Sequence, residues 1–338
     1  MCVESGSCAC IWNMKPKAIF ILGPTASGKT QLAFDLVERL KHADKHGQNF
    51  EIISVDSALV YCDMNIGTAK PDVTTLKKYP HHLINLIAPT EAYSAARFCR
   101  EALPLMSDIV ARGSVPLLVG GTMLYAKALT EGLSDMPESD PRLRRELDER
   151  AALIGWPAMH AELAKVDAVT ATRLKPNDSQ RIQRALEIFQ QTGVSISSLQ
   201  RRAEHQYSWP YEALIIGLMP TDRAILHHRI ATRFDAMLVA GLLDEVRRLR
   251  EQYLLHADMP SMRAVGYRQT WEFLDKGDSS PAAREELRQK SIAATRQLAK
   301  RQMTWLRSMP GVEMVDCLRA DLNAAVSVRV ANFLQIKK

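Results

Sequence analysis

The stretch Gly23-Pro24-Thr25-Ala26-Ser27-Gly28-Lys29-Thr30 matches the pattern G-x-x-x-x-G-K-[ST] at every fixed position. It follows the apolar run KAIFIL (17–22), which predicts a buried strand, and it precedes a segment with helical spacing that runs to about Leu40. In this setting the backbone N–H groups of the loop and the helix N-terminus bind an anion. Lys29 reaches terminal phosphates, and the Thr30 hydroxyl is a ligand for Mg²⁺. Residues 23–30 therefore predict a site for a phosphate chain and Mg²⁺, and they do not specify ATP.

Apolar runs recur along the chain and alternate with helical segments. They are EIISV (51–55), HLINLI (82–87), VPLLVGG (115–121) and ALIIGLM (213–219), and a helix from Ser94 to Arg112 separates the second from the third. Apolar strands that alternate with helices are typical of a parallel sheet covered on both faces. Together with the phosphate loop, the pattern predicts an α/β fold of the P-loop NTPase type in which 213–219 is the last strand.

The stretch 133–210 interrupts this rhythm, because it contains no strand pattern and is rich in helix-forming residues. We interpret it as a helical insertion domain within an α/β core formed by residues 15–132 and 211–310. From 222 to 308 the chain is mostly helical, with breaks near Gly241, Pro260 and Gly277. We expect residues 1–14 to form a disordered tail and residues 311–338 to form a C-terminal extension.

The composition is that of a folded protein rather than a disordered or fibrous one. The chain has 338 residues, of which 46% are apolar and 24% are charged. No apolar run reaches the roughly 18 residues that a membrane helix needs, and the first residues lack the basic segment of a secretory signal. Six cysteines, at positions 2, 8, 10, 62, 99 and 317, form no pair of CxxC motifs, so a zinc site is not expected. These features favour a cytoplasmic protein, and no dimerisation motif is evident, so a monomer is expected.

The positive charge is concentrated near the C-terminus. Residues 281–338 contain 11 Lys and Arg against 5 Asp and Glu, a difference that equals the net charge of +6 of the whole chain. A basic segment on an otherwise balanced protein is typical of a protein that binds a polyanion such as a nucleic acid. The alternative is an ordinary solvated helix face, and charge alone does not decide between the two.

Polar residues follow three of the predicted strands at the edge where the phosphate loop begins. Asp56 ends the strand 51–55, Thr122 follows Gly120-Gly121, and Arg223 opens a helix after the strand 213–219. The carboxyl ends of parallel strands face the ligand crevice in open α/β sheets. We therefore expect Asp56 to act as a base or metal ligand and Arg223 to bind phosphate oxygens. Taken singly, each of these residues has the alternative role of a cap or a surface group.

Two readings of the phosphate site compete on these residues. A small-molecule or nucleotide kinase explains the loop and Asp56 but leaves the basic C-terminal segment without a role. A non-catalytic RNA-binding protein with an inactive loop leaves Asp56 and Thr122 without one. The chain has no NKxD motif of a GTPase, and PLLVGGT (116–122) lacks the acidic end of a motor-type strand.

Ten blocks of sequence together resemble the tRNA dimethylallyltransferase family, also called tRNA isopentenyltransferases, over roughly residues 15–310. The blocks are GPTASGKT (23–30), ISVDSALVY (53–61), MNIGTAKP (64–71), PHHLIN (80–85), YSAARF (93–98), GGTMLY (120–125), NDSQRIQRALE (177–187), IGLMPTDRAILHHRI (216–230), RAVGYRQ (263–269) and ATRQLAKRQMTWLR (294–307). The phosphate loop alone is weakly specific. The combination of DSALVY and GTAKP with RAVGYRQ and KRQMTWLR is highly specific.

The resemblance implies an activity and a set of roles. Members of this family transfer the five-carbon group of dimethylallyl diphosphate to N6 of adenosine 37 of tRNA and release pyrophosphate. The phosphate loop then holds the diphosphate of the prenyl donor, together with Lys29, Arg223 and Mg²⁺ bound through Thr30. Asp56 and Thr122 are the implied catalytic residues, which orient and deprotonate the amine of a base extruded from the anticodon loop.

The resemblance also implies the residues that contact the anticodon stem-loop. Asp56, Ser57, Ala58, Leu59 and Thr122 would line the pocket for the target base. Further contacts are implied for Arg144, Gln180, Arg181, Ile182, Gln183 and Arg184 in the insertion, for Arg263, Ala264, Val265, Gly266, Tyr267 and Arg268, and for Lys300, Arg301, Gln302, Met303, Thr304, Trp305, Leu306 and Arg307. Trp305 has the alternative role of a core aromatic residue.

Overall fold

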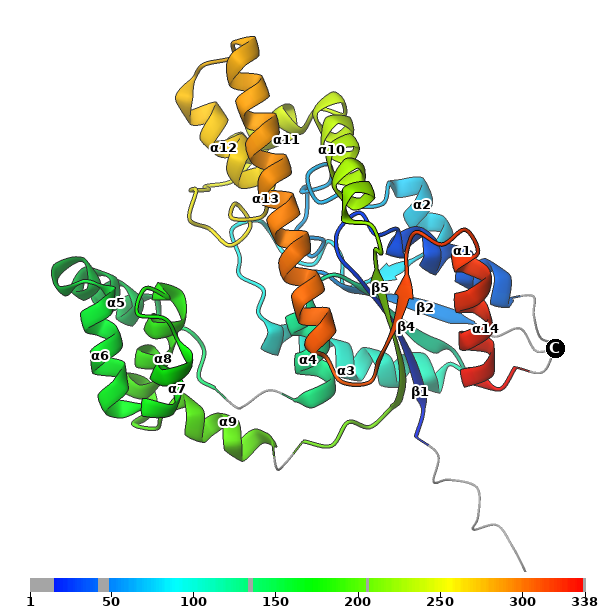
Figure 1. The fold of residues 1–338 in the computed structure, drawn as a ribbon, viewed down its shortest axis with the longest axis horizontal. Coiled ribbons are helices and arrows are strands. Elements are labelled where there is room, and N and C mark those ends of the chain that lie inside the picture. Colours follow the sequence, from blue (N-terminus) through cyan, green and yellow to red (C-terminus); the bar gives the residue numbers. More distant parts are fainter. Residues whose placement is uncertain (1–14, 42–48, 133–135, 205–206, 337–338) are drawn as a thin grey trace, which may run out of the picture. The chain divides into compact units, whose positions relative to one another are not determined.

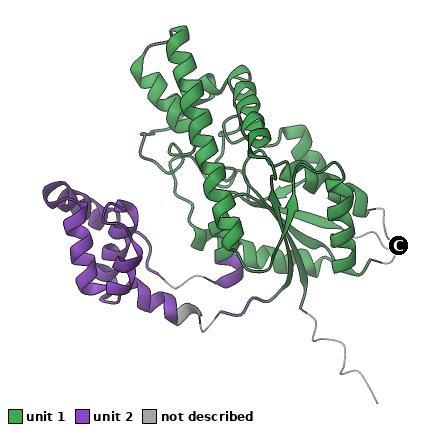
Figure 2. Ribbon diagram, viewed as in Figure 1, with its two compact units in different colours: residues 1–127, 210–338 green, residues 128–209 purple. Residues whose placement is uncertain are grey.

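The computed structural model describes residues 15–41, 49–132, 136–204 and 207–336. The tail expected at 1–14 therefore lies outside the described residues. The chain divides into two compact units, with residues 1–127 and 210–338 in unit 1 and residues 128–209 in unit 2 (Figure 2). Each unit is described separately below. No helix among the described residues is long and apolar enough to cross a membrane.

Unit 1 is built on a six-stranded sheet whose strands all run parallel, in the order β3-β2-β4-β1-β5-β6 (Figure 1). The strands are β1 (Lys17–Leu22), β2 (Phe50–Val55), β3 (His81–His82), β4 (Val115–Gly120), β5 (Glu212–Met219) and β6 (Val312–Asp316). The central strand β1 pairs Ile19 with Leu117 on β4 and with Leu214 on β5. The parallel α/β fold predicted from the apolar runs is confirmed.

Helices cover both faces of this sheet. The helices of unit 1 in the described part of the chain are α1 (Lys29–Lys41), α2 (Val73–Lys78), α3 (Ala95–Ala111), α4 (Met123–Glu131), α10 (Arg223–Val239), α11 (Leu242–Gln252), α12 (Tyr267–Lys276), α13 (Pro281–Ser308) and α14 (Leu322–Leu334). α1 and α14 pack on one face, where Leu32 and Val326 join alternate sheet residues such as Ile19 and Ile216 in one buried cluster. α3 packs against β4 from the opposite side (Figure 1). Burial of both faces explains why the strands are continuous apolar runs.

The structure differs from the sequence-based expectation at both edges of the sheet. Of the run 82–87, only His82 belongs to β3 (His81–His82), because Leu83 and Asn85 adopt left-handed φ angles of 61° and 52° that turn the chain away. At the other edge, β6 pairs with β5 after the strand 213–219 that was expected to be last. Residues beyond 310 therefore complete the sheet and, through α14, one layer of the core.

A second layer of unit 1 is formed by α10 to α13, which pack on one another around a separate apolar cluster (Figure 1). The expected breaks occur at Gly241, which caps the start of α11, and at Gly277, which caps the end of α12, with φ angles of 96° and 68°. α13 is long and begins at an N-cap, where the Ser280 side chain accepts a hydrogen bond from the Ala283 amide. This layer supplies one wall of the site described below.

Unit 2 consists mainly of five helices around its own core. They are α5 (Pro141–Ile154), α6 (Trp156–Val166), α7 (Ala168–Arg173), α8 (Ser179–Thr192) and α9 (Ile196–Glu204). Its buried cluster includes Leu147, Leu163 and Ile182. A fully buried carboxylate, Glu187, accepts hydrogen bonds from Ser139 and Asp140 and pairs with Arg144 and Arg184. The negative charge of the buried Glu187 is thus balanced by two arginines and two hydrogen-bond donors within unit 2.

Candidate active site

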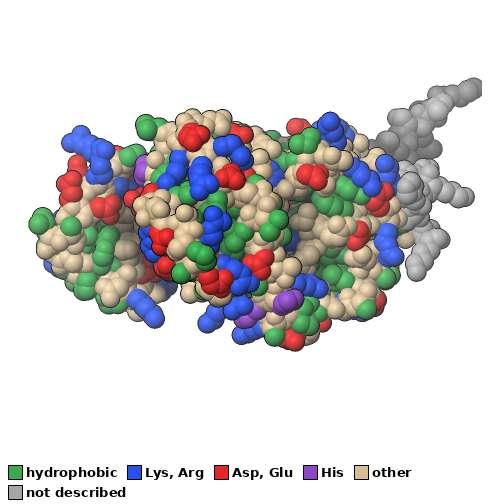
Figure 3. Space-filling view, turned by 90° about the horizontal axis from the view of Figure 1, so that it is seen from above, with side chains coloured by type: hydrophobic (Ala, Val, Ile, Leu, Met, Phe, Trp, Pro, Cys, Tyr) green, Lys and Arg blue, Asp and Glu red, His purple; other side chains and the backbone are tan. Residues whose placement is uncertain are grey.

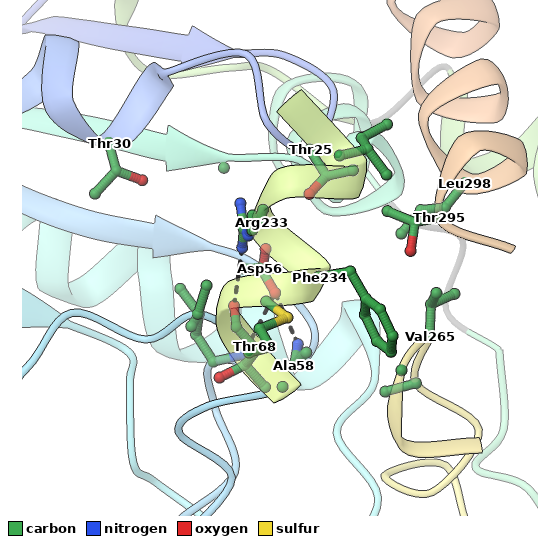
Figure 4. Close-up of a pocket in the computed structure, with 18 of the residues that line it drawn as sticks. Thr25, Thr30, Asp56, Ala58, Thr68, Arg233, Phe234, Val265, Thr295 and Leu298 are labelled. Carbon is green, nitrogen blue, oxygen red and sulfur yellow. Dashed lines mark hydrogen bonds between the residues drawn. The ribbon is translucent and has the colours of Figure 1, made fainter. Parts of the chain in front are cut away.

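A cavity of about 180 Å³ opens at the carboxyl ends of the central strands of unit 1 (Figure 4). One end is polar and is lined by Thr25, Lys29, Thr30 and Asp56. Figure 4 shows Phe234, Val265 and Leu298 on the side away from Thr30, with Thr295 beside them. The apolar lining also includes Ile230 and Met237 of α10. The cavity therefore suits a ligand with a charged end and a short hydrocarbon end.

The phosphate loop lies at the polar end in the conformation that its sequence predicts. Ala26 and Gly28 adopt left-handed φ angles of 63° and 86°, and the Ser27 amide donates to the Pro24 carbonyl. Alternation of right- and left-handed residues makes successive N–H groups converge on one point, which forms an anion-binding concavity. α1 begins at Lys29, so the N-terminal end of its dipole faces the same point. Residues 23–30 are therefore shaped for a phosphate group.

Three charged side chains meet at this end of the cavity: Lys29, Asp56 and Arg233. Burial lowers the pKa of Lys29 to about 8, Asp56 opposes the shift, and Arg233 adds to it. Burial likewise lowers the pKa of Arg233, and Asp56 again opposes the shift. Two largely buried cations thus share one carboxylate, which leaves an excess of positive charge. A diphosphate would compensate that excess.

Arg233 was not singled out from the sequence, whereas Arg223 was. Arg223 is the first residue of α10 and is exposed, and it does not line the cavity. Arg233, ten residues later on the same helix, points into the cavity beside Asp56 and donates a hydrogen bond to the Thr68 carbonyl at 3.4 Å (Figure 4). The helical spacing of Arg233 with the apolar Ile230 and Phe234 is the signal that could have identified it. Of the two arginines, Arg233 lines the cavity in this structure, and the assignment of Arg223 to the phosphates stays a prediction.

Asp56 and Thr122, the two predicted catalytic residues, are brought together by the loop after β2. The Thr122 hydroxyl accepts a hydrogen bond from the Ser57 amide at 3.0 Å and donates one to the Ser57 hydroxyl at 3.3 Å. The Oδ1 atom of Asp56 accepts hydrogen bonds from the amides of Ala58 and Leu59, at 2.9 and 3.3 Å. The backbone of one short loop therefore fixes both side chains, as a pre-organised site requires.

Gln302 connects α13 to both loops of the site. Its Oε1 atom accepts a hydrogen bond from the Thr25 amide at 2.8 Å, and its Nε2 atom donates to the Gly121 carbonyl at 2.9 Å. A Cβ atom at Gly121 would lie only 2.5 Å from Nε2, so this approach requires glycine. Gln302, predicted from the resemblance to contact RNA, thus holds the phosphate loop against the turn that carries Thr122.

The remaining residues predicted to contact RNA differ in exposure. Those of intermediate exposure are Ala58, Leu59, Arg144, Arg184, Ala264 and Val265, and Gly266 is buried. Exposed residues on α13 are Lys300, Arg301, Thr304, Trp305 and Arg307, and those elsewhere are Ser57, Gln180, Arg181, Arg263 and Arg268. Ile182, Gln183, Tyr267, Met303 and Leu306 are at most 4% exposed. These five side chains pack in the interior, because they occupy the inward positions of their helices, so we keep only the exposed residues as proposed side-chain contacts with RNA.

On the face seen in Figure 3, the basic residues do not form one large patch. There, Lys and Arg side chains are interspersed with Asp and Glu. On α13, by contrast, Lys300 and Arg301 lie together with Thr304 and Trp305 along a shallow groove. The side chain of Trp305 is 37% exposed, which excludes its alternative role as a fully buried core residue. An exposed indole beside two cations is a surface on which a nucleic acid can stack and pair its phosphates.

Comparison with known sequences identifies the family. The IPP transferase family model matches residues 59–309. The tRNA dimethylallyltransferase of Thiobacillus denitrificans is 56% identical over 319 residues, which cover 94% of this chain and 97% of that protein. The tRNA dimethylallyltransferase of Dechloromonas aromatica is 54% identical over 319 residues, with 94% and 98% covered.

Solved structures agree with this assignment. The full-length tRNA isopentenylpyrophosphate transferase of Bacillus halodurans superposes with a TM-score of 0.66 at 34% identity, over 95% of this chain and 97% of that chain. A eukaryotic dimethylallyltransferase that acts on tRNA superposes with a TM-score of 0.77 at 28% identity, over 96% of this chain and 81% of that chain. The chain belongs to the tRNA dimethylallyltransferase, or IPP transferase, family.

Proposed function

We infer that this chain transfers the dimethylallyl group of dimethylallyl diphosphate to N6 of adenosine 37 of tRNA and releases pyrophosphate. The family assignment supports this reaction. The observation that carries it in the structure is the division of the cavity into two ends. Lys29, Arg233 and the phosphate loop suit a diphosphate, and the wall that includes Phe234 and Leu298 suits a five-carbon chain.

The donor would lie with its diphosphate on the phosphate loop and its hydrocarbon toward α10. When the bond between C1 of the dimethylallyl group and oxygen breaks, its electron pair passes to the diphosphate. Lys29 and Arg233 would stabilise the negative charge that develops there. Because both cations are already in place and partly withdrawn from water, little reorganisation is needed at that moment.

The acceptor amine would approach the C1 atom beside Asp56 and Thr122. N6 of adenosine 37 forms the new bond to C1, and the proton that N6 loses passes to the Asp56 carboxylate. Thr122, whose hydroxyl is oriented by Ser57, would hold the amine in line with the breaking bond. The adenine must leave the anticodon loop to reach this point, since its N6 is otherwise directed into the loop.

We also propose Mg²⁺ as the cofactor. Among the described residues, no group of three or more His, Cys, Asp or Glu side chains could hold a metal ion by itself. The Thr30 hydroxyl at the cavity is a suitable oxygen ligand, and Mg²⁺ commonly takes its other ligands from phosphate oxygens and water. When bound, the ion would neutralise charge on the leaving pyrophosphate.

The tRNA would contact both units. On unit 1 the proposed contacts are exposed side chains of α13, mainly Lys300, Arg301 and Trp305, together with the exposed Arg263 and Arg268. On unit 2, the exposed Gln180 and Arg181 on the first turn of α8 are the proposed contacts, so that residues 133–210 serve as an RNA-binding insertion. With tRNA as acceptor, we propose that the chain acts in the cytoplasm, as a monomer.

One assay separates this function from the two competing ones. Purified protein is incubated with Mg²⁺, unmodified tRNA and dimethylallyl diphosphate labelled in the prenyl group. Label recovered in the RNA supports prenyl transfer. Transfer of the γ-phosphate of ATP without RNA labelling would support a kinase, and tRNA binding with neither reaction would support a non-catalytic RNA-binding protein.

A further inference from the structure

We propose that Glu245 is a positioning residue for the prenyl donor, because it fixes two separate walls of the donor cavity through one buried carboxylate. The proposal rests on the proposed function for its substrate. Glu245 lies on α11, outside the cavity, and it belongs to none of the sequence blocks that resemble the family.

The carboxylate of Glu245 is surrounded by hydrogen-bond donors. Its Oε2 atom accepts from the amides of Asn65 and Ile66, at 3.0 and 2.7 Å. Its Oε1 atom accepts from the Gly67 amide at 3.1 Å and from the Tyr267 hydroxyl at 2.5 Å. The residue is only 3% exposed. Four donors on two oxygens meet the needs of a carboxylate withdrawn from water.

The Tyr267 hydroxyl acts as a hydrogen-bond donor to Glu245. The residue is fully buried, and burial together with the neighbouring Glu245 raises the pKa of its hydroxyl. The phenol therefore keeps its proton and donates a hydrogen bond to the carboxylate. The contact between the two segments is close, since a Cβ atom at Gly67 would lie 2.4 Å from the Tyr267 ring. Gly67 is required for the loop to pass this ring.

Each segment held by Glu245 goes on to line the cavity. After the three amides at 65–67, Gly67, Thr68 and Ala69 form one wall, and the Thr68 carbonyl accepts the hydrogen bond of Arg233 (Figure 4). Before Tyr267, residues 264–266 form another wall, which includes Val265. A displaced Glu245 side chain would thus move the carbonyl that orients the buried guanidinium and, independently, the wall opposite it.

A variant of Glu245 can distinguish a role in positioning the donor cavity from a role in stabilising the fold alone. Glu245→Gln keeps the size of the side chain but places an N–H₂ group against donors, so at least one buried donor loses its acceptor. If Glu245 served only to stabilise the fold, the variant would melt at a lower temperature but bind the donor normally once folded. If it positions Arg233 and the cavity wall, the folded variant would bind diphosphate more weakly and tRNA normally.

The test measures binding separately from turnover. Inorganic pyrophosphate and dimethylallyl diphosphate are titrated by calorimetry below the melting temperature of each variant, and tRNA binding is measured by filter retention. For Glu245→Gln we expect both dissociation constants for the phosphates and the KM for the donor to rise about 5-fold or more, with tRNA affinity within about 2-fold of wild type. The exposed Glu251→Gln on the same helix is the matched control and should bind as wild type.

Tyr267→Phe and Gly67→Ala decide the matter if Glu245→Gln does not fold. The first removes one of the four hydrogen bonds and the second pushes the Tyr267 ring, so each should raise the pyrophosphate dissociation constant in the same direction, by about 2-fold or more. Wild-type phosphate binding in the folded variants would overturn the proposal. That result would not bear on prenyl transfer by the wild-type protein. Failure of the wild-type protein to transfer the prenyl group would overturn only the proposed function.

Discussion

The side chain of Gln302 accepts a hydrogen bond from the backbone amide of Thr25 at 2.8 Å, so a helix that carries exposed cations is tied directly to the phosphate loop. Lys300 and Arg301 on the same turn of α13 face solvent, while Gln302 faces the cavity. The same amide group of Gln302 also donates to Gly121, next to Thr122. The proposed RNA surface and both halves of the proposed catalytic site thus meet at one residue.

Gln302→Ala should therefore reduce catalysis rather than RNA binding. Loss of two hydrogen bonds frees the phosphate loop and the Thr122 turn, and we expect kcat/KM to fall by roughly 10- to 100-fold. The dissociation constant for tRNA, measured by filter retention, should stay within about 2-fold. A large loss of tRNA affinity at unchanged kcat would instead mean that Gln302 contacts RNA, as the resemblance alone implies.

The two arginines of α10 distinguish the sequence-based assignment from the structural one. Arg233→Met removes a cation from the cavity next to Asp56 and should raise the KM for dimethylallyl diphosphate by roughly 10-fold or more. Arg223→Met changes an exposed residue that does not line the cavity, and its KM should be close to wild type. Steady-state kinetics on both variants measures this difference in KM. A larger rise in KM for Arg223→Met than for Arg233→Met would show that Arg223 binds the diphosphate.

Binding of the donor should depend on pH through Lys29. Its pKa is lowered to about 8 in the free protein, mainly by burial, so the ammonium form that attracts diphosphate predominates below pH 8 and is lost above it. We expect the dissociation constant for dimethylallyl diphosphate to rise by up to about 5-fold between pH 8 and pH 9. Because the bound anion favours the charged form, binding at pH 8 should also take up protons.

Calorimetry in buffers of different ionisation enthalpy measures both the pH dependence of donor binding and the proton uptake by Lys29. Lys29→Met is the control, since it should bind weakly at every pH and show no proton uptake from this group. A wild-type affinity that is flat from pH 7 to pH 9 would contradict the assignment of Lys29 as a buried, diphosphate-facing ammonium.

Salt dependence tests the RNA surface on α13. Lys300→Ala and Arg301→Ala should each weaken tRNA binding and reduce the slope of log K against log salt by about 0.7–0.9, as expected for one lost phosphate contact. Their melting temperatures should not change, because both side chains are exposed. Arg284→Ala, an exposed change on the first turn of the same helix, is the control and should keep the wild-type slope. Unaltered slopes for Lys300→Ala and Arg301→Ala would exclude this surface.

Arg184 needs a different interpretation from the α13 cations. It pairs with the fully buried Glu187 at 2.9 Å and donates to the Pro137 carbonyl at 2.6 Å. Removing it leaves a buried carboxylate with fewer partners, so loss of tRNA binding by Arg184→Ala would report the folding of unit 2 as well as RNA contact. The exposed Arg181 is the cleaner probe of this surface.

The sequence predicts those parts of the fold that depend on residues close together in the chain, such as a short motif or an apolar run. The phosphate loop is recognisable because Gly28 and Lys29 have fixed places in a short turn, and β1, β2 and β4 are recognisable because burial on both faces makes them apolar throughout. Asp56 and Thr122 follow from the same rule, since residues at the ends of parallel strands share one edge.

The parts that the sequence does not predict depend on packing between distant segments. β6 is a short edge strand with an exposed Met314, so it lacks the apolar run that marks a central strand. Arg233 and Glu245 look like ordinary charges on amphipathic helices, and only the packing of α10 and α11 buries them against Asp56 and Tyr267. The motif RAVGYRQ (263–269) does not reveal that Tyr267 is buried, because a motif gives the order of residues and not the direction of each side chain.

The most direct test of the central claim maps the product of the reaction on the RNA. Wild-type protein and Asp56→Asn are each incubated with Mg²⁺, labelled dimethylallyl diphosphate and unmodified tRNA carrying either adenosine or guanosine at position 37, and the digested RNA is analysed by mass spectrometry. We predict prenylated adenosine only with adenosine 37, formed about 10²- to 10⁴-fold more slowly by Asp56→Asn because the proton acceptor is lost. Prenylation of the guanosine 37 tRNA, full activity of Asp56→Asn, or no labelled RNA with the wild-type protein would contradict the account.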